Sequence, residues 1–158
     1  SRLAQPLTLM SIDPETENSI AKTLFNHVWT LIQSEARTPV QDDEMEWAAM
    51  ASLYHWSKVG DAGNLAIGQW QVAHVYLRLG RLEEAKRYAQ KVIETCMGAG
   101  LGDFYLAYGY LELARALRSE GKEGEAHAYA LKAKETPMAD PHDQEHFDQD
   151  FKSDGWAS

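Results

Sequence analysis

The sequence is poor in cysteine and in long apolar runs. Cys96 is the single cysteine among 158 residues, so the chain cannot form an internal disulfide. No stretch approaches the roughly 20 consecutive apolar residues that a membrane-spanning helix needs. The first ten residues have one basic residue and too short an apolar stretch for a signal peptide. These absences predict a cytoplasmic protein with no membrane partner, in which Cys96 is a buried apolar filler.

Basic residues are also scarce. The chain has 15 lysines and arginines against 24 aspartates and glutamates, which gives a formal net charge of -9. Much of the excess lies in residues 139–154, which hold six acidic residues and a single base, Lys152. Proteins that bind nucleic acid through its phosphates rely on clustered lysine and arginine. We therefore predict no nucleic-acid partner.

The familiar sequence signatures of catalysis are missing. The chain contains no G-x-S-x-G, no H-E-x-x-H, no phosphate-binding glycine loop and no C-x-x-C. We predict a non-catalytic protein with no catalytic residues and no cofactor. A small metal- or anion-dependent enzyme built from His55, His74 and the histidines near the C-terminus stays open as a less favoured alternative.

Helical periodicity dominates what is present, and no run alternates with the period of a strand. Asp13 and Pro14 form an N-cap followed by proline in the first turn, which predicts a helix from about Pro14 to Ala36. The acidic run before Trp47 predicts the start of a second helix, which ends near Lys58. The pattern therefore indicates an all-α protein.

The second half of the chain contains an internal repeat. Residues 65–97 align without gaps on residues 106–138, an offset of 41, with 13 identities in 33 positions. The identities include Gly80 and Gly121, which suit tight turns between helices, and alanines that let helices approach closely. Each copy is predicted to form a helix-turn-helix hairpin, and stacking of the hairpins buries their apolar faces.

The two copies resemble the tetratricopeptide repeat (TPR) family. The Trp, Leu, Gly and Tyr positions of that family's first helix correspond to these residues in the two copies: Gln69, Val72, Ala73 and Tyr76, then Tyr110, Leu113, Ala114 and Leu117. The second-helix alanine is matched by Ala85 and Ala126. The family's next aromatic residue and its closing proline are replaced in both copies, by Ala89 and Ala130 and by Met97 and Met138. The 41-residue spacing also exceeds the family's standard of about 34.

The resemblance implies an all-α fold, a right-handed α-α superhelix of about three helical hairpins with a C-terminal capping helix. The whole chain, residues 1–158, is expected to form a single domain. Within it we assign residues 14–59 to a divergent first hairpin, 64–97 and 105–138 to the clear repeats, 140–152 to the capping helix and 153–158 to a frayed tail.

In TPR proteins the first helix of each hairpin lines a concave groove. The resemblance therefore implies an aromatic and cationic groove whose partner-binding candidates are Trp70, Gln71, His74, Arg78, Tyr108, Glu112, Arg115 and Arg118. Arginine offers a fork of donors to carboxylates, and tryptophan and tyrosine offer rigid apolar area. The expected function is a TPR-like protein-interaction module that binds a peptide segment or a small anionic ligand. The alternative is a scaffold whose helical stack mediates homo-oligomerisation.

Three further histidines have two interpretations each. His55 lies near the end of the second predicted helix, where it is either a structural residue at a junction between hairpins or a binding contact at the groove edge. His142 and His146 have the spacing of a two-histidine metal site, but the sequence fixes no third ligand. A polar helix face is the favoured interpretation of this pair, and we assign no metal site.

Overall fold

The computed structural model of the protein describes residues 12–156, and these form helices joined by short connections, without a strand. The all-α prediction is confirmed. The question of a signal peptide concerns the first residues of the chain and lies outside the described part. Among residues 12–156, no helix has the length and apolar character required to span a bilayer.

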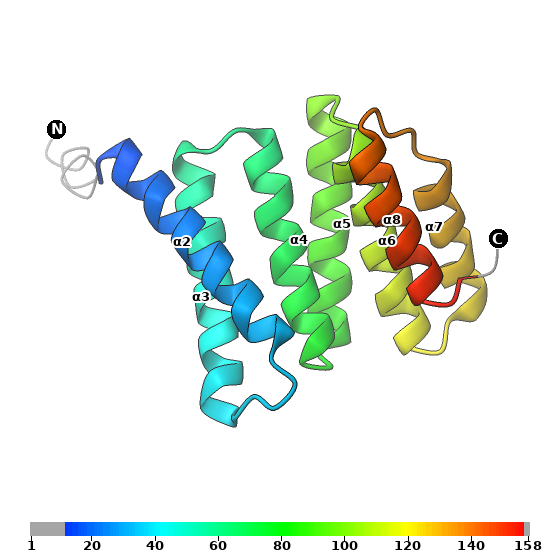
Figure 1. Cartoon of the computed structure of the whole chain (residues 1–158), viewed down its shortest axis with the longest axis horizontal. Helices are drawn as coiled ribbons and strands as arrows, with labels where there is room; N and C mark the ends of the chain where they lie inside the picture. Colours follow the sequence, from blue (N-terminus) through cyan, green and yellow to red (C-terminus); the bar gives the residue numbers. More distant parts are fainter. Residues whose placement is uncertain (1–11, 157–158) are drawn as a thin grey trace, which may run out of the picture.

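Six of the helices form three successive pairs. The first pair is α2 (Pro14–Gln33) with α3 (Pro39–Val59), the second is α4 (Ala62–Arg78) with α5 (Leu82–Ala99), and the third is α6 (Asp103–Ser119) with α7 (Glu123–Glu135). The pairs stand side by side, and α8 (Pro141–Ser153) lies against α6 (Figure 1). Helix α4 also contacts both α2 and α6, so the first helices of the three pairs are neighbours in one layer.

The boundary between the first two helices differs from the prediction. Helix α3 begins at Pro39 rather than in the acidic run, because Thr38 and Gln41 form a capping box in which each side chain accepts a hydrogen bond from the other residue's backbone N–H. Helix α2 ends at Gln33 rather than Ala36. The Arg37 guanidinium donates to the carbonyl oxygens of Leu31 and Ser34, at 3.1 Å each. These bonds supply partners for carbonyl groups that have none within the helix at its C-terminal end.

The turns of the second and third pairs depend on glycine. Gly80 and Gly121 have φ angles of 75° and 83°, in the left-handed region that the sequence predicted for them. Neither residue has a neighbour within 4 Å of the position a Cβ would take, so backbone conformation alone restricts these positions. The matched alanines of the two copies are buried, which lets paired helices pack closely.

The C-terminal segment packs more firmly than predicted. Asp140 caps α8, and its Phe147 and Phe151 are buried against the rest of the core. Gly155, with φ of 80°, then turns the chain back so that Trp156 is buried as well. Trp156 therefore packs against the fold, within the segment 153–158 for which the sequence predicted a frayed tail.

Two glycines three residues apart test the role of backbone conformation in the last turn. Gly121→Ala forces a left-handed alanine and is expected to lower the free energy of unfolding by about 1 kcal/mol. Gly124→Ala lies inside α7 with open space around it, and should raise the same quantity by up to about 1 kcal/mol. Urea unfolding of both variants measures the difference. Equal changes in the two variants would contradict the assigned role of Gly121.

Candidate functional site

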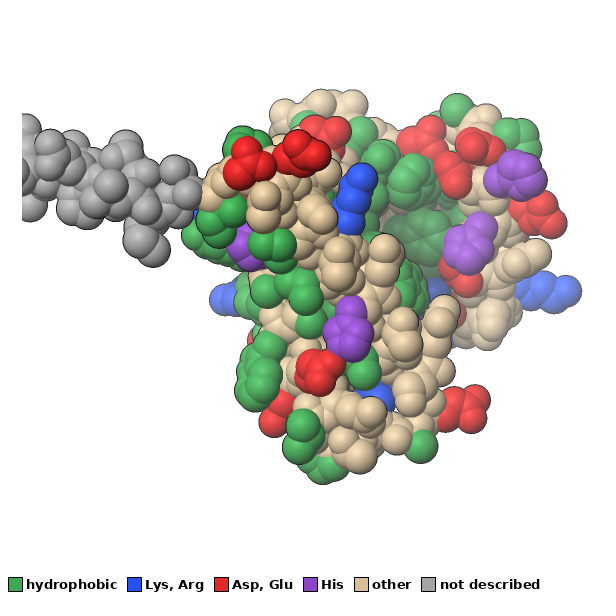
Figure 2. Space-filling model, turned by 60° about the vertical axis from the view of Figure 1, so that its left-hand side comes forward, with side chains coloured by type: hydrophobic (Ala, Val, Ile, Leu, Met, Phe, Trp, Pro, Cys, Tyr) green, Lys and Arg blue, Asp and Glu red, His purple; other side chains and the backbone are tan. Residues whose placement is uncertain are grey.

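A groove of about 790 Å³ opens on the layer formed by the first helices of the three pairs. It is bounded by α2, α4, α6 and α8. Figure 2 shows hydrophobic side chains in the hollow of this face, with acidic side chains and histidines at its right-hand side. Its lining residues are Phe25, Trp29, Gln33, Ala66, Ile67, Trp70, His74, Arg78, Phe104, Tyr105, Tyr108, Arg115, His146, Asp150, Ser153 and Asp154.

Aromatic rings form the centre of the groove. The Trp70 ring stacks on the His74 ring with centroids 4.8 Å apart and an interplanar angle of 12°. Trp29, from α2, lies against one side of Trp70 at 5.8 Å, and Tyr108, from α6, meets it edge-on at 6.1 Å. Three helices therefore contribute to one aromatic surface, held by contacts between the rings.

A buried carboxylate lies beneath this surface. Glu112 is fully buried, and its two oxygens accept hydrogen bonds from different partners, His74 Nδ1 at 2.6 Å and Arg115 Nη1 at 2.8 Å. Burial by itself raises the pKa of the Glu112 carboxyl, but the facing His74 and Arg115 outweigh it and hold this pKa below its ordinary value. Burial by itself lowers the pKa of Arg115, but the carboxylates of Glu112 and Asp154 raise it above its ordinary value and keep the guanidinium charged.

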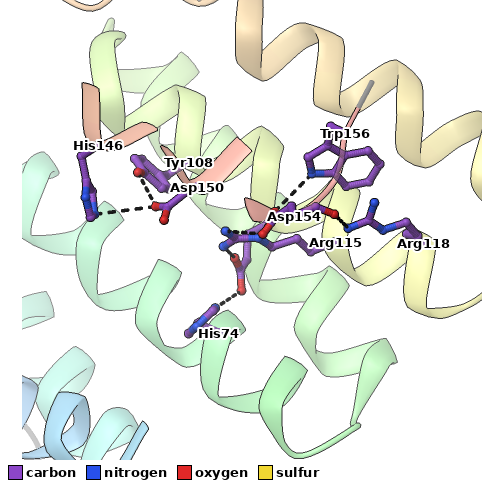
Figure 3. Close-up of polar contacts among 9 residues, drawn as sticks. His74, Tyr108, Arg115, Arg118, His146, Asp150, Asp154 and Trp156 are labelled. Atoms are coloured by element: carbon purple, nitrogen blue, oxygen red, sulfur yellow. Dashed lines mark hydrogen bonds and ion pairs between the residues drawn. The ribbon is translucent and has the colours of Figure 1, made fainter. Parts of the chain in front are cut away.

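Arg115 also contacts the segment that follows α8. Its Nε donates to Asp154 Oδ2 at 2.6 Å and its second terminal nitrogen donates to Asp154 Oδ1 at 3.2 Å, a two-bond pairing of guanidinium and carboxylate. The Arg118 side chain donates to the Asp154 backbone carbonyl at 2.7 Å and stacks on the Trp156 ring at 3.7 Å (Figure 3). The chain's own carboxylate thus occupies the position where the sequence predicted an anionic ligand.

A second carboxylate, Asp150, lies on the α8 side of the groove. The Tyr108 hydroxyl donates to Asp150 Oδ2 at 2.6 Å, and His146 Nε2 lies 3.6 Å from the same oxygen. Burial and the Asp150 carboxylate both raise the pKa of Tyr108, so its hydroxyl keeps its proton. Among the described residues, no hydrogen bond reaches Asp150 Oδ1.

The structure places five of the predicted binding residues around the groove, namely Trp70, His74, Arg78, Tyr108 and Arg115. The other four do not line it. Glu112 is buried beneath the groove, and Arg118 is engaged with Trp156. Gln71 is buried on another side of α4, where its amide donates to the Phe25 carbonyl oxygen at 2.9 Å and so joins α4 to α2.

His55 is the fourth residue outside the groove. Its Nδ1 lies 3.1 Å from Glu17 Oε2, so it joins α3 to α2 within the first pair rather than at a junction between pairs. Histidines 55 and 74, which the enzyme alternative would combine, are held by carboxylates in different parts of the fold.

The groove also contains residues that the sequence did not single out as binding candidates. Phe25 and Trp29 enter from α2, and Phe104 and Tyr105 from the start of α6. One signal was available, because Trp29 matches Trp70 at the repeat offset of 41. Asp150 and Asp154 carried no such signal, since their place in the groove depends on how α8 returns to α6.

His142 and His146, the weak metal candidates, both lie on α8. Within residues 12–156, no three histidine, cysteine, aspartate or glutamate side chains gather as metal ligands would. Cys96 is buried as predicted, and burial raises the pKa of its thiol to about 11.

Comparison of the chain with protein-family models, with curated proteins and with solved structures found no match. The groove therefore has to be interpreted from its own geometry and chemistry.

Glu112→Gln tests the buried carboxylate. Removing one partner of a buried ionic cluster leaves Arg115 and His74 less well compensated, so we expect the free energy of unfolding at pH 7 to fall by roughly 3 kcal/mol. Glu94→Gln on the exposed face of α5 is the control, with an expected change within about 0.5 kcal/mol.

The same variant predicts a change in pH dependence. Because the pKa of Glu112 is lower in the folded protein than the ordinary 4.5, its stabilising contribution is present above pH 4.5 and is lost as the pH falls through the folded value. The stability of Glu112→Gln should therefore decline less steeply below pH 4.5 than that of the wild type. Urea unfolding at a series of pH values measures both effects, and parallel pH profiles would contradict the assignment.

Proposed function

We propose that the protein is a non-catalytic interaction module that binds an extended peptide segment of a partner protein in the groove between α2, α4, α6 and α8. The observation that carries this proposal is the continuous aromatic surface of Trp29, Trp70 and Tyr108 on the floor of an open groove. Rigid aromatic side chains supply large contact area at low entropic cost, and they dominate the energetics of many peptide-binding surfaces.

The Trp70 indole carries an unsatisfied donor. Its Nε1 is buried, and no described residue accepts its proton. A buried donor without an acceptor costs about 1–3 kcal/mol. Because this atom has no exposed surface, a peptide carbonyl oxygen reaches it only after the side chains around it move.

A small anionic ligand is less well supported than a peptide. The guanidinium of Arg115 already pairs with Glu112 and Asp154, and the Arg118 guanidinium is used by the segment after α8. An entering anion would have to displace the Asp154 carboxylate. Arg78, at the end of α4, is the exposed arginine of the groove that has no ion pair within residues 12–156.

The repeat interpretation belongs to the same proposal. Three successive helix pairs whose first helices share one layer are the arrangement expected of a TPR-like, right-handed superhelix, with α8 as its capping helix. Peptide binding on the layer of first helices is the function that the resemblance implies. A cytoplasmic location stays a prediction.

Replacement of Trp70 tests peptide binding. Peptides selected from a random library displayed on phage, with the full chain as bait, should bind Trp70→Ala more weakly by about 2 kcal/mol or more, measured by calorimetry. Trp47→Ala, which removes an exposed tryptophan on α3 away from the groove, is the matched control and should leave binding unchanged. Trp70→Phe separates loss of binding from loss of packing, with circular dichroism as the check on folding. Selected peptides that bind Trp70→Ala and the wild type equally would contradict the proposal.

Self-assembly is a second candidate function because of an apolar stripe on the outside of α3. Val40, Trp47 and Tyr54 are spaced by seven residues, lie on one face of the helix and are exposed, as is Met50 beside them. Trp47 is 67% exposed, which is unusual for a side chain of its size in a monomer. A second copy of the chain would bury this stripe by pairing its own α3 against it.

Trp47→Glu tests self-assembly. If two copies associate through α3, a charge at the centre of the stripe should weaken association by about 2 kcal/mol, seen by sedimentation velocity over a range of concentrations. Met97→Glu, an equally exposed apolar position on α5, should leave association unchanged. A wild-type protein that is monomeric at every concentration would rule the scaffold out.

A further inference from the structure

We propose that the groove selects a partner segment carrying a lysine or arginine side chain, which binds between the aromatic rings of Trp70 and Tyr108 and the carboxylate of Asp150. This inference rests on the proposed peptide-binding function and names the chemistry of the side chain that the groove takes. It reverses the expectation of a cationic groove that binds carboxylates.

The first argument is that the positive charge at the groove floor is already neutralised. Arg115, the central cation, faces two carboxylates of the chain itself, Glu112 at 2.8 Å and Asp154 at 2.6 Å. His74 shares the Glu112 carboxylate, and Glu112 has no exposed surface. A negatively charged ligand therefore meets a floor with no spare positive charge near Trp70.

Arg78 does not change this balance at Asp150. It lies eight residues after Trp70 on α4, which places its backbone roughly 12 Å further along the helix. At physiological ionic strength an exposed charge at such a distance is largely screened. The end of the groove near Arg78 and the end near Asp150 are therefore electrostatically distinct.

The second argument is that Asp150 has an acceptor to spare. Its side chain is 33% exposed, Tyr108 donates to one of its oxygens, and among the described residues no group donates to the other oxygen. His146 is 70% exposed and lies 3.6 Å from the oxygen that Tyr108 already uses. An ammonium or guanidinium group could reach Asp150 Oδ1 directly, without displacing the Tyr108 hydroxyl.

The third argument is the position of the rings. Tyr108 meets Trp70 edge-on and holds Asp150 through its hydroxyl, so the aromatic surface and the carboxylate are adjacent. A cation near the faces of such rings gains favourable interaction with their π-electrons, most strongly with tryptophan. The aliphatic stem of a lysine or arginine would cover apolar ring surface while its charged end pairs with Asp150.

The wider charge of this side agrees with a basic partner. The acidic residues that line the groove, Asp150 and the already paired Asp154, lie on its α8 side, and the whole protein carries a net charge of -9. A net negative charge favours the approach of a basic segment.

The test starts from peptides selected from a random library displayed on phage, with the full chain as bait and Trp70→Ala as the counter-selection. Peptides that depend on Trp70 should be enriched in lysine and arginine. Their affinity is then measured for the wild type, for Asp150→Asn and for Asp148→Asn. The control variant removes the same charge from an exposed position on α8, whose carboxylate contacts Gln144.

We expect Asp150→Asn to weaken binding roughly fivefold more than Asp148→Asn does. Acetylation of the critical peptide lysine removes its charge and should weaken binding to the wild type by a similar factor, but have little further effect on Asp150→Asn, since both changes remove the same interaction.

Two results would overturn the inference while leaving peptide binding in place. One is a set of Trp70-dependent peptides without basic residues or rich in aspartate and glutamate. The other is an equal effect of Asp150→Asn and Asp148→Asn. Failure to select any peptide that depends on Trp70 would instead overturn the proposed function and this inference together.

Discussion

The buried Glu112 carboxylate is the interaction on which the arrangement of the groove depends. It lies on α6, accepts from His74 on α4 and from Arg115 on its own helix, and through Arg115 it is linked to Asp154 after α8. A carboxylate without exposed surface is tolerated only when its oxygens are satisfied, so these partners have little freedom to move. The position of His74 in turn fixes Trp70, because the two rings are stacked.

The groove is therefore aromatic at its surface and ionic beneath it. Most of the charged groups pair with one another, which leaves the aromatic side chains that line the groove and the partly exposed Asp150 carboxylate for an incoming ligand. This division into an aromatic surface and an ionic layer beneath it matters because the ionic layer holds the side chains of the groove in place. A preorganised site binds without first ordering its own side chains. Because the charge of Arg115 is neutralised within the fold, the number of arginines in the sequence overstates the positive charge of the groove.

The local features of the fold could be predicted from the sequence, whereas the contacts made when α8 docks on the earlier helices could not. Gly80 and Gly121 were identified as turn residues because a repeated glycine between helices has a specific conformational reason. Trp70 and Tyr108 were candidates because the first helix of each hairpin lines the groove in the family that the repeats resemble. The pairing of Arg115 with Asp154 joins residues 39 positions apart through the docking of α8, and no local pattern encodes it. The α3 boundary was missed for a smaller reason, since the Thr38 capping box competed with an acidic run that also suits a helix start.

The place of α8 in the chain has a consequence for synthesis. One wall of the groove, with Asp150 and the segment that holds Arg115, comes from the last helix of the described residues. During translation the three helix pairs emerge first and can pack on one another before α8 leaves the ribosome. The nascent chain thus exposes the aromatic floor, with Arg115 paired to Glu112 alone, until α8 docks and brings Asp154 to the guanidinium.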